Sequence, residues 1–170
     1  MKKIFIFILI IIFCIFIYKL QKKETSYEPI NLNKNHICAS DEMIIINYNG
    51  PKAQIIWKDG SRSFYCEVRE AFYESLDKVR SKFISNFYVQ DFSNIEWGSY
   101  TDKWVPAKDS YFVVNSQKLG AMGLSYVPFS DIECAKKFKN ENGGDLLSFK
   151  DISKETILKT VEILEQNPIY

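Results

Sequence analysis

The sequence predicts an α+β protein made of two tandem ββαβ units behind an N-terminal transmembrane anchor. Two observations predict the units: strand-like and helix-like segments follow each other in the same order in both halves, and Ser63-Phe64-Tyr65-Cys66 before one helix parallels Val127-Pro128-Phe129-Ser130 before the other. A third, the apolar N-terminus, predicts the anchor. The expected division is an anchor over residues 1–23, a polar tether over 24–36, a first unit over 37–96 and a second unit with a C-terminal helix over 97–170.

The N-terminal segment has the composition of a membrane anchor. Fifteen apolar or aromatic residues, Ile4–Tyr18, are flanked by lysines on both sides. As a helix they span about 22 Å, and the Lys19 side chain can extend this length by reaching the interface. A cleaved signal peptide needs small residues near its end and a lipid-attachment site needs them before Cys14, but neither pattern is present. We expect an uncleaved single-pass anchor that holds the body on the periplasmic side of the inner membrane.

The first unit is expected to contain four strands and one helix. Asn49-Gly50-Pro51 and Asp59-Gly60 are turn sequences between apolar segments. Apolar residues three and four positions apart predict an amphipathic helix over Glu67–Phe83. The expected strands are Met43–Tyr48, Ala53–Lys58, Ser63–Cys66 and Phe87–Phe92.

The second unit has the same kinds of segment. Ser130-Asp131-Ile132-Glu133 is a capping-box pattern that starts a helix, and Asn142-Gly143-Gly144 ends it. Ser153–Gln166 predicts a last helix. The expected strands are Tyr111–Asn115, Tyr126–Phe129 and Leu146–Phe149.

Composition excludes several classes of function. Without the anchor, the body carries 17 basic and 21 acidic residues, so it has no nucleic-acid-binding footprint. His36 is the only histidine, which argues against His-rich metal sites and Ser-His-Asp catalysis. The body has three cysteines and no paired Cys-x-x-Cys, which argues against a structural zinc site.

Candidate metal ligands come from the sulfur-containing residues. Met43 and Met122 are the only methionines besides the initiator; each lies beside turn residues, and Cys38 lies five residues before Met43. Thiolate and thioether ligands select Cu(I), so these three residues are candidate Cu(I) ligands. Alternatively, all three fill gaps in the core.

The remaining candidates have plainer interpretations. Cys66 and Cys134 are expected to be core residues, with a disulfide as the next choice. His36 is expected to be an exposed tether residue, and Asp41 and Glu42 to be solvated.

Seven segments of the body carry a resemblance to a known family. They are Gly50-Pro51-Lys52-Ala53-Gln54-Ile55, Phe64-Tyr65-Cys66, Tyr88-Val89-Gln90-Asp91, Lys103-Trp104-Val105-Pro106-Ala107, Tyr111-Phe112-Val113-Val114, Gly120-Ala121-Met122-Gly123 and Gly143-Gly144-Asp145-Leu146-Leu147-Ser148-Phe149. In this order and at similar spacing, they resemble the NosL family of copper chaperones associated with nitrous oxide reductase. The resemblance covers residues 38–151, nearly the whole body, and the family fold of two ββαβ units agrees with the repeat.

The resemblance implies a ligand set that this sequence matches only in part. The family's ligands come from a Cys-x-x-Cys-Gly-Met segment and a later Met in a Gly-rich loop. Met43 and Met122 match the two methionines and Cys38 the first cysteine, but Asp41-Glu42 stand in place of the Cys-Gly. We hypothesise that Cys38 replaces the missing thiolate; otherwise the site is Met43 and Met122 alone, with Asp41 or Glu42 nearby.

Three functions remain open at this stage. The leading one is extracytoplasmic Cu(I) binding and delivery to nitrous oxide reductase, without catalysis, by a monomer or by a homodimer around a shared metal. The alternative is a metal-free interaction or assembly module of the same pathway. The third is an enzyme that cleaves a carbon–mercury bond, as organomercurial lyases do, whose core fold is related to that of the family. It rests on the Cys-x-x-Asp spacing of Cys38-Ala39-Ser40-Asp41, with Cys38 as nucleophile and Asp41 as general acid.

Overall fold

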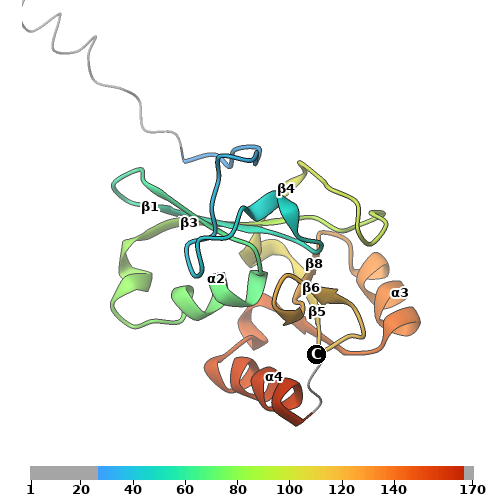
Figure 1. The fold of residues 1–170 in the computed structure, drawn as a ribbon. Helices are drawn as coiled ribbons and strands as arrows, with labels where there is room; N and C mark the ends of the chain where they lie inside the picture. Colours follow the sequence, from blue (N-terminus) through green and yellow to red (C-terminus); the bar gives the residue numbers. More distant parts are fainter. Residues whose placement is uncertain (1–26, 167–170) are drawn as a thin grey trace, which may run out of the picture.

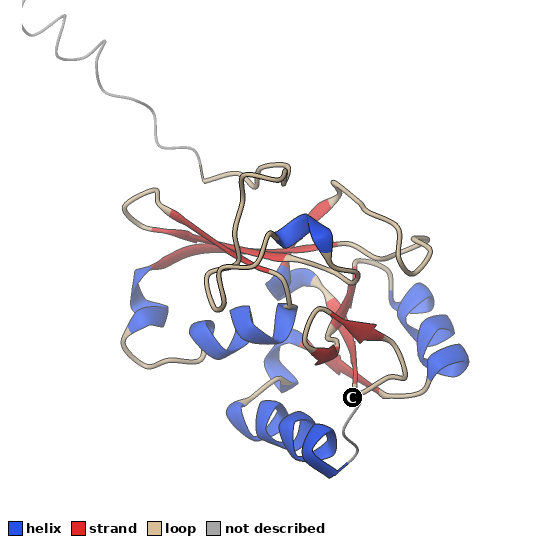
Figure 2. Ribbon diagram, viewed as in Figure 1, coloured by secondary structure: helices blue, strands red, loops and turns tan. Residues whose placement is uncertain are grey.

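The computed structural model describes residues 27–166, which form a mixed α/β fold (Figures 1 and 2). The first antiparallel sheet has the order β2-β1-β3-β4, with β1 Ala53–Trp57, β2 Arg62–Tyr65, β3 Ile84–Gln90 and β4 Trp104–Pro106. The second has the order β8-β5-β9, with β5 Tyr111–Val114, β8 Val127–Phe129 and β9 Asp145–Ser148. A separate hairpin pairs β6 Leu119–Gly120 with β7 Gly123–Leu124.

Three α-helices accompany the strands: α2 Val68–Ser75, α3 Ile132–Asn142 and α4 Lys154–Gln166. Short 3-10 helices span Ile45–Asn47, Arg80–Phe83, Ala107–Asp109 and Phe149–Asp151. The expected mixed α and β class is confirmed. In both sheets the strand that comes first in the sequence lies between two later ones: β1 lies between β2 and β3, and β5 lies between β8 and β9. In sequence, helix α2 precedes β3 and helix α3 precedes β9.

The two sheets share one core centred on Phe72 of α2. The Phe72 ring contacts aromatic rings from both halves, with centroid distances of 5.1 Å to Phe87, 5.0 Å to Phe112 and 5.4 Å to Phe149. Ring contacts of this kind add to the burial of apolar area. Helix α2 is therefore fixed from both sides, and its N-terminal end is a rigid place for a site.

The segment over residues 27–36 lies against the first sheet. The side chain of Gln54 in β1 accepts from the Ile30 amide at 3.1 Å and donates to the Ile30 carbonyl at 2.7 Å. Leu32 is buried. These contacts bring the chain from the edge of the described region to Cys38.

The expected strand Met43–Tyr48 is wrong. Ile44 makes only an isolated bridge with Ile37, and Ile45–Asn47 forms a 3-10 helix. The chain folds back here because the Cys38 amide donates to the Met43 carbonyl at 2.8 Å, with Glu42 in the left-handed region at φ 62°. A turn of this kind prevents extended pairing.

The expected helix Glu67–Phe83 is too long. Helix α2 ends at Ser75, and the Asp77 carboxylate accepts from the amides of Val79 and Arg80, both at 2.8 Å. Short acidic side chains favour such turns over a continuing helix. The chain then enters a 3-10 turn, so β3 begins at Ile84 and ends before Phe92, earlier than expected.

Other boundaries differ by little. Helix α3 is capped by Asp131 rather than Ser130 and ends at Gly143, while β9 ends at Ser148, one residue before the expected end. Strand β4 and the β6–β7 hairpin were not predicted. Within residues 27–166 no helix is both long and apolar enough to cross a membrane, and the anchor expected over residues 1–23 lies outside the described residues.

Candidate metal centre

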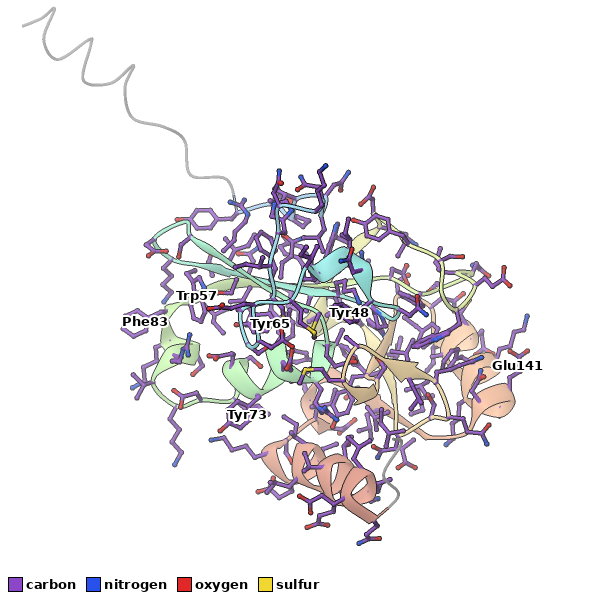
Figure 3. All side chains as sticks on the ribbon, viewed as in Figure 1. Tyr48, Trp57, Tyr65, Tyr73, Phe83 and Glu141 are labelled. Atoms are coloured by element: carbon purple, nitrogen blue, oxygen red, sulfur yellow. The ribbon has the colours of Figure 1, made fainter. Side chains whose placement is uncertain are left out.

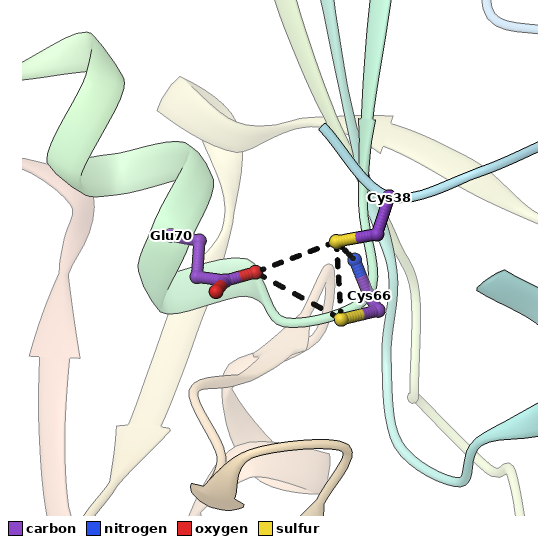
Figure 4. Close-up of side chains that lie close together, drawn as sticks. All are labelled: Cys38, Cys66 and Glu70. Carbon is purple, nitrogen blue, oxygen red and sulfur yellow. Dashed lines mark hydrogen bonds between the residues drawn. The ribbon is translucent and has the colours of Figure 1, made fainter. Parts of the chain in front are cut away.

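Two cysteines that are far apart in sequence meet beside the first sheet. Cys38 lies in the segment before β1 and Cys66 directly after β2. The Ala39 amide donates to the Phe64 carbonyl at 2.8 Å, which holds the two segments side by side. The sulfurs are 3.1 Å apart (Figure 4), both residues are buried, and both are free thiols.

Two carboxylates face the sulfur pair. Glu70, in the first turn of α2, places Oε2 3.7 Å from Cys38 Sγ and 3.8 Å from Cys66 Sγ (Figure 4). Asp41 Oδ2 lies 3.8 Å from Cys66 Sγ. The Ser40 hydroxyl donates to Glu70 Oε2 at 2.8 Å and fixes that carboxylate. We call Cys38, Cys66, Glu70 and Asp41 the thiol–carboxylate cluster.

A hydrogen bond joins the two thiols, and it shifts their pKa values in opposite directions. The Cys66 backbone amide also donates to Cys38 Sγ, at 3.2 Å. The thiol–thiol bond lowers the pKa of Cys38 and raises that of Cys66. Burial raises the pKa of Glu70 to about 7. The cluster therefore presents one reactive thiolate near neutral pH.

A buried lysine provides positive charge behind the cluster. Lys52 is 2% exposed, and its ammonium donates to the carbonyl of Cys66 at 3.2 Å and to that of Asn49 at 3.1 Å. Burial lowers its pKa, while the negative charges of Glu67, Cys66 and Cys38 act to raise it. A cation at this place favours the anionic form of the sulfurs.

The methionines lie at different depths. Met43 is half-buried and packs, with Ala121, against a small apolar cluster that contains Cys38 and Cys66. Met122 lies in the turn between β6 and β7 and is 38% exposed. The structure therefore brings the expected ligands Cys38 and Met43 into one cluster and places the neighbour of Met122 against it.

The Met122 turn is attached to α2 by two charged side chains. Arg69 donates to the Met122 carbonyl at 3.3 Å. The fully buried Glu67 accepts from the Ser125 hydroxyl at 2.6 Å, and a Cβ atom on Gly120 would lie 2.3 Å from Glu67 Oε2. Burial raises the pKa of Glu67 to about 7. Glu67 thus fits only a glycine at position 120.

A cavity of about 250 Å³ lies beside the cluster. Ser40 and Glu70 line it together with the buried Tyr65 and the exposed Tyr73, and Figure 3 labels the two tyrosines. The Glu70 carboxylate of the cluster is therefore reached from this cavity.

Sequence reasoning missed Cys66 and Glu70 as site residues. Cys66 is buried, as expected, but its sulfur faces Cys38 instead of only apolar neighbours. A Cys followed by Glu four positions later, across a helix start, would have placed both on one side of α2. His36, half-buried, accepts from the Asn33 amide at 2.9 Å and packs edge-on against Phe64. Cys134 is half-exposed, far along the chain in α3.

The donor set fits a soft cation. Two thiols lie 3.1 Å apart, Met43 packs on the same apolar cluster, and soft sulfur ligands select Cu(I). The carboxylates are hard donors and poor Cu(I) ligands. The arrangement can bind a monovalent soft metal ion.

Comparison with known proteins agrees with this chemistry. The chain matches the NosL family over residues 29–157. It is 29% identical over 135 residues to the copper-binding lipoprotein NosL of Stutzerimonas stutzeri, covering 79% of this chain and 70% of that one. It is 32% identical over 133 residues to the copper-binding lipoprotein NosL of Achromobacter cycloclastes, covering 75% and 67%. The crystal structure of the copper chaperone NosL from Shewanella denitrificans superposes with a TM-score of 0.73 at 28% identity, covering 76% of this chain and 98% of that one.

Proposed function

The chain belongs to the NosL family, whose named relatives are copper-binding proteins and not enzymes, and we propose that it is a Cu(I) carrier that holds the metal between Cys38 and Cys66. The observation that carries the proposal is the 3.1 Å separation of the two sulfurs. Two free thiols at this distance, backed by the Lys52 ammonium, are a preorganised soft site.

Copper replaces the proton between the sulfurs. With metal–sulfur bonds of about 2.3 Å, a three-coordinate site needs sulfurs about 4.0 Å apart. The pair therefore opens by about 1 Å as the hydrogen bond is exchanged for metal bonds. Loss of the second thiol proton leaves a bis-thiolate Cu(I) unit with one negative charge, which the Lys52 ammonium offsets.

A methionine supplies the third sulfur. Met43 already packs on the cluster, and Met122 lies next to Ala121, which also packs there. We propose Met43 as the resident third ligand and Met122 as the exposed thioether that takes the copper during transfer. In this proposal Cys66 provides the second thiolate, since position 41 is an aspartate. From the sequence, Cys38 alone was expected to replace the missing thiolate.

The wider role follows from the family and remains part of this proposal. The protein delivers copper to nitrous oxide reductase from the periplasmic side of the membrane, where residues 1–23 anchor it. We keep the division into tandem ββαβ units over residues 37–96 and 97–170 as part of the proposal, although β4 Trp104–Pro106 of the second range pairs in the first sheet. Both cysteines of the sulfur pair lie in the first range. A homodimer that shares one copper ion is the alternative to a monomeric carrier, and the number of copper ions bound per chain distinguishes the two.

The test is an anaerobic Cu(I) titration against a chromophoric chelator. Wild-type protein is expected to bind one copper per chain, Cys38→Ser to lose more than about 100-fold in affinity, and Met122→Leu to change the rate of transfer more than the affinity. One copper per two chains would indicate a shared site. Absence of competition with the chelator would refute the Cu(I) carrier and leave the metal-free assembly module.

A further inference from the structure

We propose that the thiol–carboxylate cluster is also a tetrahedral site for a borderline divalent cation of the Zn²⁺ class, with Cys38, Cys66, Glu70 and Asp41 as ligands. The proposal rests on the same sulfur pair as the Cu(I) site and adds a second metal to it. Zn²⁺ binds thiolate and carboxylate together, whereas Cu(I) uses only the sulfurs.

Three of the four sulfur–oxygen distances match the edges of a tetrahedron. With metal–sulfur bonds of about 2.3 Å and metal–oxygen bonds of about 2.1 Å, sulfur–oxygen edges are about 3.6 Å and the sulfur–sulfur edge is about 3.8 Å. The Glu70 edges are 3.7 and 3.8 Å, and the edge from Asp41 to Cys66 is 3.8 Å. For a four-ligand site the sulfur pair, at 3.1 Å, has to widen, and the Asp41 carboxylate has to move closer, because only the ligand atoms of Cys38, Cys66 and Glu70 all lie within 4.8 Å of one another.

Neighbouring groups already orient both carboxylates. The Met43 amide donates to Asp41 Oδ1 at 3.1 Å, which leaves Oδ2 directed at Cys66. Ser40 holds Glu70 Oε2 on the side of the sulfurs. Hydrogen bonds that orient first ligands are typical of metal sites and contribute to their affinity.

Charge also favours a divalent ion. Two thiols and two carboxylates meet at the cluster, and the buried ammonium of Lys52 contacts the Cys66 carbonyl. A monovalent ion leaves Asp41 and Glu70 uncompensated beside two thiolates. A divalent ion in contact with all four ligands reduces this repulsion directly.

The sequence argued against zinc because it lacks a paired Cys-x-x-Cys. That criterion detects only ligands that lie close together in the sequence. Here the ligands come from residues 38–41 and 66–70, which the pairing of Ala39 with Phe64 brings together. We infer that Zn²⁺ competes with Cu(I) for the cluster.

The experiment is a titration of the reduced full-length chain with Co²⁺, a spectroscopic substitute for Zn²⁺, followed by back-titration with Zn²⁺. We expect the visible bands of tetrahedral Co²⁺ together with thiolate-to-cobalt charge transfer, both removed by Zn²⁺. Glu70→Gln and Asp41→Asn should each weaken Co²⁺ binding about 10-fold or more while changing Cu(I) affinity less than about 3-fold. Glu74→Gln, one turn further along α2, is the matched control and should change neither.

The outcomes separate the two proposals. Cu(I) binding without tetrahedral Co²⁺ bands overturns the divalent site and leaves the carrier intact. Co²⁺ bands without Cu(I) binding overturn the carrier instead. Co²⁺ affinity that is unchanged by Glu70→Gln, or Cu(I) affinity that falls as much as Co²⁺ affinity does, contradicts the assignment of the carboxylates.

Discussion

The junction between a strand and the following helix is built differently in the two halves of the protein. In each half a strand leads into a helix, β2 into α2 and β8 into α3 (Figure 1). Asp131, the residue that caps α3, accepts from the Glu133 amide at 2.8 Å. Glu67, in the same position before α2, makes no capping bond and turns instead towards Ser125 and Gly120. One acid stabilises its own helix, and the other holds a distant turn.

The cysteines at these junctions differ in the same way. Cys66, directly before α2, is buried and 3.1 Å from a second thiol. Cys134, in the first turn of α3, has oxygen neighbours: Asn94 Oδ1 at 3.7 Å and Asp131 Oδ2 at 3.6 Å. The half that departs from ordinary helix capping is the half that contains the proposed metal centre, and functional sites are where departures from local rules are expected.

The largest expected effect separates the two cysteines. Cys66→Ser should lower Cu(I) affinity by more than about 100-fold, because removing a ligand exceeds the 10–100-fold cost of losing a supporting group. Cys134→Ser should leave it within about 3-fold. Chelator competition measures both, and equal losses would mean that the junctions are not functionally different.

Gly120→Ala tests the contact between Glu67 and the Met122 turn. A Cβ atom would lie 2.3 Å from Glu67 Oε2, so we expect destabilisation of about 1–3 kcal/mol, typical of overpacking. In the Glu67→Ala background the same change should cost much less. Urea unfolding of the four proteins gives the coupling energy, and additive costs would contradict a shared contact.

Asp91 tests how the second junction is held. Burial acts to raise its pKa, but hydrogen bonds from Lys103 and Ser130 outweigh this and lower the pKa to about 2. Because the folded-state value is below the unfolded value of about 3.9, this stabilisation is present above pH 4 and is lost as the pH falls towards 2. Asp91→Asn should cost about 2 kcal/mol at pH 7 and progressively less below pH 4.

Unfolding measured across this pH range checks the Asp91 prediction. The stability difference between wild type and Asp91→Asn should shrink with falling pH. A difference that stays constant down to pH 2 would mean that the carboxylate charge has no part in it.

The smallest expected effect is that of the helix cap. Asp131→Ala should destabilise the protein by about 1 kcal/mol, the usual cost of a lost capping bond. Its Cu(I) affinity should not change, since the junction before α3 contributes no ligand. Thermal unfolding and chelator competition on the same sample check this, and weaker copper binding would tie α3 to the metal centre.

The sequence predicted the parts that depend on local patterning. The capping-box pattern at Ser130–Glu133 and the glycines Gly143-Gly144 located α3, and the turn at Asp59-Gly60 located the β1–β2 hairpin. The segment over residues 43–48 failed because the turn at Glu42 overrides its β-rich composition, and the long helix failed because Asp77 caps a new turn. Both are short-range contacts that apolar periodicity does not record.

The proposed metal centre could be predicted only in part. Cys38 and Met43 were chosen as candidate ligands because they lie close in sequence beside a turn. The meeting of Cys38 with Cys66 depends on pairing between residues 25 positions apart, through Ala39 and Phe64. The spacing of residues along the chain does not predict such long-range pairing, so Cys66 was expected to be a core residue.

X-ray absorption at the copper edge of the Cu(I)-loaded chain tests the central claim most directly. If Cys38 and Cys66 hold the metal together, wild-type protein should show sulfur scatterers without oxygen or nitrogen, and Cys66→Ser should lose one sulfur while Cys134→Ser keeps them all. An identical sulfur count in wild type and Cys66→Ser would contradict the account.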